Sequence, residues 1–157
     1  MMEEHPNGLY AFVKVGEYLE EHDWHPQRIP DKYTYRTAFH GKNGNILCYA
    51  QVRIEAEQLV FYAMAPIKIA EEQRPTVAEF LTRANYGMYI GNFEMDWNDG
   101  EVRYKSSIDF EGTQLNDLLI RNTIYPAVRL MDRYLPGLFK VAYGGVSPLD
   151  AVREIED

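Results

Sequence analysis

The chain has 157 residues, of which 46% are hydrophobic and 13% aromatic, a composition typical of a packed globular protein and not of a disordered one. Its net charge of −8 argues against nucleic acid or an anionic membrane as the main partner. No apolar run is long enough to predict a membrane-spanning helix, and the polar N-terminal residues lack the pattern of a secretory signal. With a single cysteine, Cys48, we expect a cytoplasmic protein.

The first predicted element is an amphipathic helix. Residues 1–8 are expected to be a frayed end. Apolar residues then recur at helical spacing from 9 to about 24, with glutamates on the opposite side. Pro26 and Pro30 end this helix, so 25–32 is predicted to be a loop.

Two strand patterns, over 33–40 and 46–54, predict a hairpin. They flank Asn43-Gly44, a dipeptide typical of a two-residue hairpin turn. With that turn as the loop, Phe39 pairs with Cys48 on the inner face, and the polar residues of both strands fall on the outer face.

A third strand and a second helix follow. The strand is predicted over 59–65, where β-branched and aromatic residues are frequent, and Pro66 ends it. The helix is predicted over about 77–88. Thr76 and Glu79 have the spacing of a capping box at its start.

The stretch 91–112, GNFEMDWNDGEVRYKSSIDFEG, carries the clearest signal for a second hairpin. Asp99-Gly100 favours a two-residue turn, which pairs Trp97 with Val102 and Glu94 with Lys105. One face is then charged and forms cross-strand pairs. The apolar face, on which the helices should pack, comprises Phe93, Met95, Trp97, Val102 and Tyr104.

A long third helix is predicted after this hairpin. Thr113 can cap it, Pro126 predicts a kink, and Pro136 is expected to interrupt it again. It ends before two consecutive glycines. Ser147, followed by proline, predicts the N-cap of a short final helix over 148–155.

The resulting order is α-β-β-β-α-β-β-α plus a short C-terminal helix. Strands joined by hairpins and grouped apart from helices indicate an α+β fold, here an antiparallel sheet of about five strands with helices packed on it. No linker or repeat divides the sequence, so we expect a single domain over 1–157.

No group of residues in the sequence predicts chemistry. The acidic run from Glu94 fails as a calcium loop, because its sixth and twelfth positions are Asp99 and Lys105 rather than Gly and Glu. Cys48 and His40 fall on opposite faces of their hairpin, so they cannot form a catalytic pair. We therefore predict no catalytic residue, no cofactor and no metal site, and a protein that is not an enzyme.

Two weaker patterns have simpler interpretations. His22 and His25 could offer a nitrogen pair, but zinc needs three or four ligands, so they are interpreted as surface residues at a helix end. Gly144-Gly145 before Ser147 could bind an anion at a helix N-terminus. A turn followed by an N-cap explains the same residues without a ligand, and we favour it.

The hairpin sequence of 91–112 and the ending VAYGGVSPLDAVREIE resemble the YbjN-like domain, a bacterial group labelled as sensory transduction regulators. The resemblance covers about residues 9–156. The order of elements is also similar to that of type III secretion chaperones, which generally dimerise and bind extended segments of their partners. The resemblance implies a non-enzymatic regulatory or partner-binding role and transfers no catalytic residue.

The third helix carries apolar residues around more than one face, which indicates either deep burial or a dimer interface. The candidate partner or dimer surface comprises Leu118, Leu119, Ile120, Ile124 and Tyr125. Further tyrosines that the core could leave partly exposed are Tyr49, Tyr62, Tyr86 and Tyr89.

We expect a regulatory or chaperone-like module, a homodimer that binds a protein or extended peptide. The alternative is a small-molecule-binding or enzymatic domain with a site between sheet and helices.

Overall fold

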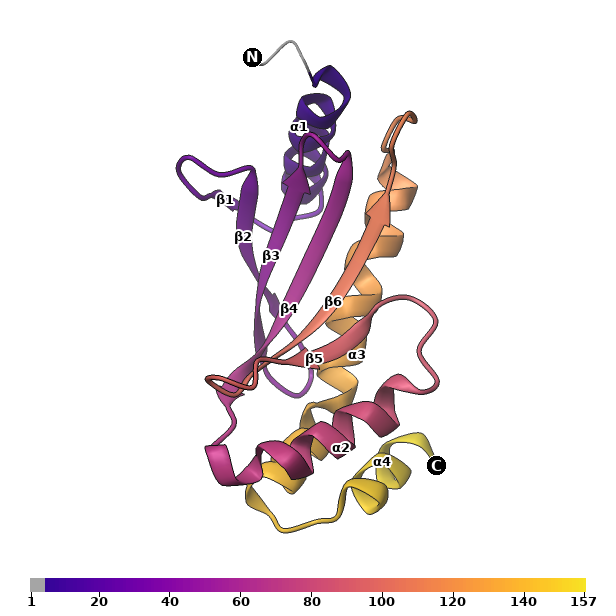
Figure 1. The fold of residues 1–157 in the computed structure, drawn as a ribbon. Coiled ribbons are helices and arrows are strands. Elements are labelled where there is room, and N and C mark those ends of the chain that lie inside the picture. The colour runs from indigo at the N-terminus through magenta and orange to yellow at the C-terminus, as the bar shows by residue number, and fades with distance from the viewer. Residues whose placement is uncertain (1–4) are drawn as a thin grey trace.

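The computed structural model describes residues 5–157, which form an antiparallel sheet and four α-helices (Figure 1). The elements in chain order are α1 (Pro6–Glu21), β1 (Gln27–Arg28), β2 (Thr34–His40), β3 (Asn45–Arg53), β4 (Gln58–Lys68), a 3-10 turn (Glu71–Gln73), α2 (Arg74–Asn85), β5 (Asn92–Met95), β6 (Glu101–Asp109), α3 (Asp117–Tyr143) and α4 (Pro148–Glu156). The strands lie in the order β1-β2-β3-β4-β6-β5. The α+β prediction is confirmed, with six strands instead of about five.

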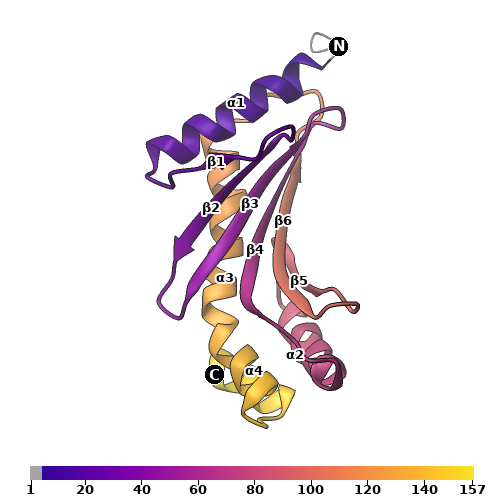
Figure 2. The ribbon, with the colours of Figure 1, turned by 90° about the vertical axis from the view of Figure 1, so that its left-hand side faces the viewer.

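The helices cover one face of the sheet. Helix α3 runs along this inner face, α1 crosses it near one end, and α2 and α4 pack against α3 at the other end (Figure 2). Among the described residues, no helix packs on the opposite, outer face. The sheet therefore has a buried side and an open side.

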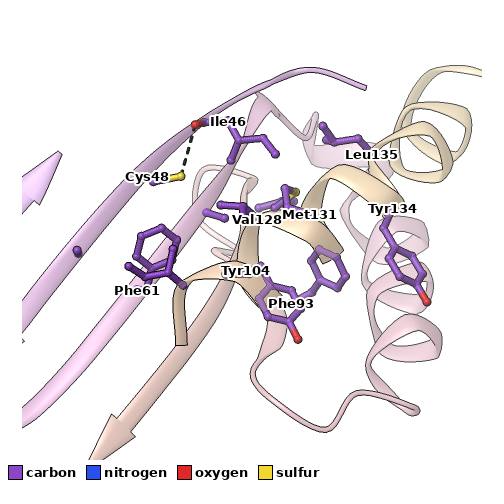
Figure 3. Close-up of a cluster of buried hydrophobic side chains, with 14 of the residues drawn as sticks. Ile46, Cys48, Phe61, Phe93, Tyr104, Val128, Met131, Tyr134 and Leu135 are labelled. Carbon is purple, nitrogen blue, oxygen red and sulfur yellow. Dashed lines mark hydrogen bonds between the residues drawn. The ribbon is translucent and has the colours of Figure 1, made fainter. Parts of the chain in front are cut away.

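The core lies between the inner face and α3 (Figure 3). Ile46, Cys48 and Phe61 from the central strands pack toward Val128 and Met131 of α3, and all five side chains are buried. Full burial of such an apolar side chain contributes roughly 1.5–3 kcal/mol. The space between sheet and helix is thus filled by packed side chains.

The hairpin of β2 and β3 has the predicted faces but not the predicted register. Thr37 lies opposite Cys48, and Phe39 opposite Ile46, a shift of two residues from the prediction. The loop has four residues, and the Gly41 N–H donates to the Gly44 carbonyl at 2.9 Å. A shift of two keeps every side chain on its face, so only the pairing was wrong.

This longer loop is held by α3. The Asp132 carboxylate accepts hydrogen bonds from the backbone N–H groups of Lys42 (3.1 Å) and Asn43 (2.8 Å). The Asn43 side-chain amide donates to the Asp132 carbonyl at 2.9 Å. That carbonyl is available because Pro136, four residues on, has no N–H to donate within the helix.

The hairpin of β5 and β6 differs from the prediction in the same way. Met95 lies opposite Val102 and Glu94 opposite Arg103. Asp96 and Glu101 close a four-residue loop, with an N–H to carbonyl distance of 2.8 Å. Trp97 lies in this loop and is 57% exposed, so its predicted place on the core-facing side is wrong.

The predicted starts of two helices were also wrong. Helix α2 begins at Arg74, so Thr76 lies inside it, and no side chain caps its first turn. Helix α3 begins after Asn116 instead of Thr113, and the Asn116 side chain accepts a hydrogen bond from the Leu119 N–H at 2.9 Å. The predicted N-cap Ser147 of α4 is confirmed.

Four further predictions need correction. Helix α1 begins at Pro6, so residues 6–8 of the expected frayed end are helical; residues 1–4 lie outside the described part. Strand β1 forms in the predicted loop, and β4 continues through Pro66 with a register irregularity between Met64 and Lys68. Helix α3 continues through Pro136 without interruption.

Candidate partner-binding surface

Side chains from five strands meet on the outer face of the sheet. The strand register places Arg36, Tyr49, Tyr62 and Lys105 in one row across β2, β3, β4 and β6. The neighbouring row comprises Leu47, Met64, Arg103 and Glu94, the last from β5. Because side chains alternate along a strand, both rows point away from the helices.

The middle of these rows lines a shallow hollow of about 780 Å³. Its floor is formed by Leu47, Tyr49, Tyr62 and Met64, each only half-buried. The loop between β1 and β2 and the end of β4 form its rims. Adjoining apolar and aromatic side chains at a surface hollow are a common feature of contact sites.

Arg103 is held in a defined position at one side of the hollow. Its Nε donates to the Glu94 carboxylate at 2.6 Å, and its guanidinium carbon lies 4.2 Å from the centre of the Tyr62 ring. Lys105 contacts the same carboxylate at 3.2 Å. Burial alone raises the pKa of Glu94, but the hydrogen bonds and charges of Arg103 and Lys105 outweigh burial and hold this pKa below its usual value.

The hollow is basic, although the chain as a whole is acidic. Its lining contains three basic residues, Lys32, Lys68 and Arg103, and one acidic residue, Glu101. The net charge of the chain is −8. Arg103 and Lys68 are each paired with a carboxylate, from Glu94 and Asp99, so the excess of positive charge is small. It favours an occupant with a single negative charge over a polyanion.

The third-helix surface expected from the sequence is divided by the fold. Ile120 and Ile124 are fully buried, so they belong to the core of the monomer. Leu119 and Tyr125 are half-buried, and Tyr125 packs edge-on against Trp24 with ring centres 5.8 Å apart. Leu118 alone of this group is largely exposed, at 54%.

The tyrosines noted in the sequence fall into two places. Tyr49 and Tyr62 line the hollow and are half-buried, in keeping with the expectation that the core leaves them partly exposed. Tyr86 and Tyr89 lie in the loop between α2 and β5 and are almost completely exposed. The sequence carried no signal for the hollow itself, because the hollow forms only through the pairing of β3 with β4.

The residues considered for chemistry lie as follows. Cys48 is buried on the inner face, which raises the pKa of its thiol to about 12, while His40 is exposed on the outer face. Within residues 5–157, no group of three or more His, Cys, Asp and Glu side chains is placed to hold a metal ion. The Ser147 hydroxyl accepts from the Asp150 N–H at 3.2 Å, as a helix cap does.

The membrane prediction concerns the helices. None of those in the described part of the chain has both the length and the apolar character needed to cross a bilayer.

The fold and the open hollow define a small α+β protein with one face of its sheet free for contact. Residues 14–140 match the model of the YbjN family, described as "Putative bacterial sensory transduction regulator". The chain therefore belongs to the YbjN family. No curated protein matches it.

A solved structure supports the fold. The chain is similar to the crystal structure of YbjN, described as "a putative transcription regulator from E. coli", with a TM-score of 0.57 and 9% sequence identity. The match covers 80% of this chain and 89% of the other.

Proposed function

We propose that this protein is a non-enzymatic, cytoplasmic regulatory module that binds a protein partner as an extended segment on the outer face of its sheet. The observation that carries the proposal is the half-buried floor of Leu47, Tyr49, Tyr62 and Met64 with nothing packed on it among residues 5–157. The family description as a regulator supports a binding role.

The shape of the hollow favours an extended segment. It is shallow and open, and it is bounded by the loop before β2 on one side and by the end of β4 on the other. An extended chain presents alternate side chains to such a floor, so apolar residues at every second position can cover the tyrosines. Aromatic residues of this kind contribute most of the binding energy in many interfaces.

The interior offers less support for the alternative of a site between sheet and helices. Phe61, Met131 and their neighbours fill that space with fully buried side chains (Figure 3). A small-molecule site needs a concave space with a few converging polar groups. We therefore place binding on the outer face.

We also propose that the protein acts as a homodimer through the exposed start of α3. The ion pair between Lys14 and Asp117, at 3.2 Å, brings α1 close to this point. Tyr10, one turn before Lys14, and Leu118, beside Asp117, are both more than half exposed. Light scattering over a concentration series tests this, and a monomer at every concentration would contradict it.

The binding proposal is tested with a random peptide library displayed on phage and selected on the purified protein. We expect selected peptides to bind the native protein and to lose binding when Tyr49→Ala and Tyr62→Ala are combined. The matched control combines Tyr86→Ala and Tyr89→Ala, which removes two exposed tyrosines outside the hollow. Selected peptides that bind both double variants equally would refute the proposed site.

A further inference from the structure

We infer that the segment bound in the hollow carries a carboxylate, from an Asp or Glu side chain, that pairs with Arg103. This inference deepens the proposed function and rests on it. It assigns the chemical class of the partner: an extended peptide in which an acidic residue lies next to apolar or aromatic residues.

Arg103 has hydrogen-bond donors that can bind such a carboxylate. Glu94 accepts a hydrogen bond from its Nε, and its guanidinium carbon lies over the ring of Tyr62. In the described part of the chain, neither terminal amino group of Arg103 has a hydrogen-bond partner. The side chain is 35% exposed, so a ligand can reach it.

The contact with Glu94 and Tyr62 also reduces the entropy that binding would cost. An arginine already fixed in one orientation loses little freedom when a carboxylate pairs with it. The terminal amino groups of a guanidinium can hold two carboxylate oxygens at once. Arg103 is thus a positioned donor at the edge of an aromatic floor.

The charges around the hollow favour a short acidic segment over nucleic acid. Lys32, Lys68 and Arg103 attract an anion, whereas Glu94 and Glu101 repel a continuous run of phosphates. Lys68 is in addition paired with Asp99 at 3.3 Å. The surrounding chain is strongly acidic, which further disfavours a polyanion.

The first test compares peptide selections on three proteins: native, Arg103→Gln and Arg83→Gln. Arg83 is the matched control, because it is a similarly exposed arginine that pairs with a glutamate, Glu79, but it lies on α2. We expect Asp and Glu to be enriched on the native protein and on Arg83→Gln, and this enrichment to be lost on Arg103→Gln. Thermal melts confirm that each variant is folded.

The second test titrates one selected peptide and its Glu-to-Gln analogue against the native protein and Arg103→Gln. On the native protein the analogue should bind about tenfold more weakly, which is the loss expected for one charge-assisted pair. On Arg103→Gln the two peptides should bind equally, since the partner of the carboxylate is gone. If the Glu-to-Gln change weakens binding equally on the native protein and on Arg103→Gln, the inference is overturned.

The outcomes separate this inference from the proposed function. Binders that need Tyr49 and Tyr62 but show no acidic preference would overturn the inference and leave the proposed function standing. Binders indifferent to those tyrosines would overturn both. A labelled single-stranded oligonucleotide that binds the native protein and not Arg103→Gln would show that Arg103 binds nucleic acid, and this would overturn the inference.

Discussion

The side-chain amide of Asn43 donates a hydrogen bond to the carbonyl oxygen of Asp132 at 2.9 Å, across 89 positions of sequence. Asp132 lies in the long helix α3, and Pro136 leaves its carbonyl without a donor inside the helix. The proline that was expected to break α3 thus frees a group that anchors the loop between β2 and β3. This contact holds the four-residue loop against the helix.

Replacing Asp132 tests this anchor. Asp132→Ala removes the acceptor of two backbone N–H groups, those of Lys42 and Asn43. We expect the free energy of unfolding to fall by about 1–2 kcal/mol, measured by urea denaturation. Asn43→Ala loses one hydrogen bond, to the Asp132 carbonyl, and should lower the free energy of unfolding by a smaller amount. Equal stability of Asp132→Ala and the native protein would show that the loop holds its own shape.

A second prediction concerns the edge of the sheet at β5. The Asn85 side chain of α2 accepts from the Phe93 N–H at 2.7 Å and donates to the Phe93 carbonyl at 2.9 Å, as a neighbouring strand would. Asn85→Ala should lower the free energy of unfolding by about 1–3 kcal/mol and speed hydrogen exchange at Phe93. Asn85→Asp keeps the acceptor, so protection of the Phe93 amide should persist in it.

The loop position of Trp97 can be measured by fluorescence. The chain has two tryptophans, of which Trp24 is buried at 8% exposure and Trp97 is 57% exposed. Trp97→Phe should shift the remaining emission to shorter wavelength and make it resistant to iodide quenching. In Trp24→Phe the remaining tryptophan is Trp97, so weak quenching in that variant would favour the core-facing position that the two-residue turn predicted.

The buried tyrosines predict a loss of stability at high pH. Burial raises the pKa of Tyr18, Tyr104 and Tyr134 to about 12, and for Tyr134 a hydrogen bond to Glu156 adds to this. The folded state keeps these protons longer than the unfolded chain, whose tyrosines have pKa values near 10. Their stabilisation is therefore complete below about pH 10 and is lost as the pH rises toward 12.

Tyrosinate absorbance measures this titration directly. In the native protein, some tyrosines should ionise only well above pH 10. Tyr104→Phe should lower the number of these tyrosines and weaken the pH dependence of the free energy of unfolding. Titration of every tyrosine near pH 10 in the folded protein would contradict the burial of these hydroxyls.

Alternation predicted which side chains face the core, but not how the strands pair. Phe93, Tyr104 and Cys48 all lie on the expected face, because side-chain direction depends only on local backbone geometry. The registers depend on loop length. Contacts from Asp132, far away in sequence, and from Asp96, which flanks the loop between β5 and β6, favour four residues over two.

The candidate site was only partly predictable. Apolar residues around the third helix left two interpretations open, deep burial or a dimer interface, and the fold places Ile120 and Ile124 in the monomer core while Leu118 is exposed. Tyr49 and Tyr62 were expected only to be partly exposed, because the hollow that they line requires the pairing of β3 with β4 and the rims beyond both strands. Such long-range pairing leaves no local pattern in the sequence.

The proposed outer-face site is tested most directly by mapping a selected peptide on the isotope-labelled protein with nuclear magnetic resonance. We expect the amide shifts on titration to gather at Leu47, Tyr49, Tyr62 and Met64, with little change around Leu118. Shifts confined to the helical side, or centred on Leu118, would contradict a binding site on the outer face of the sheet.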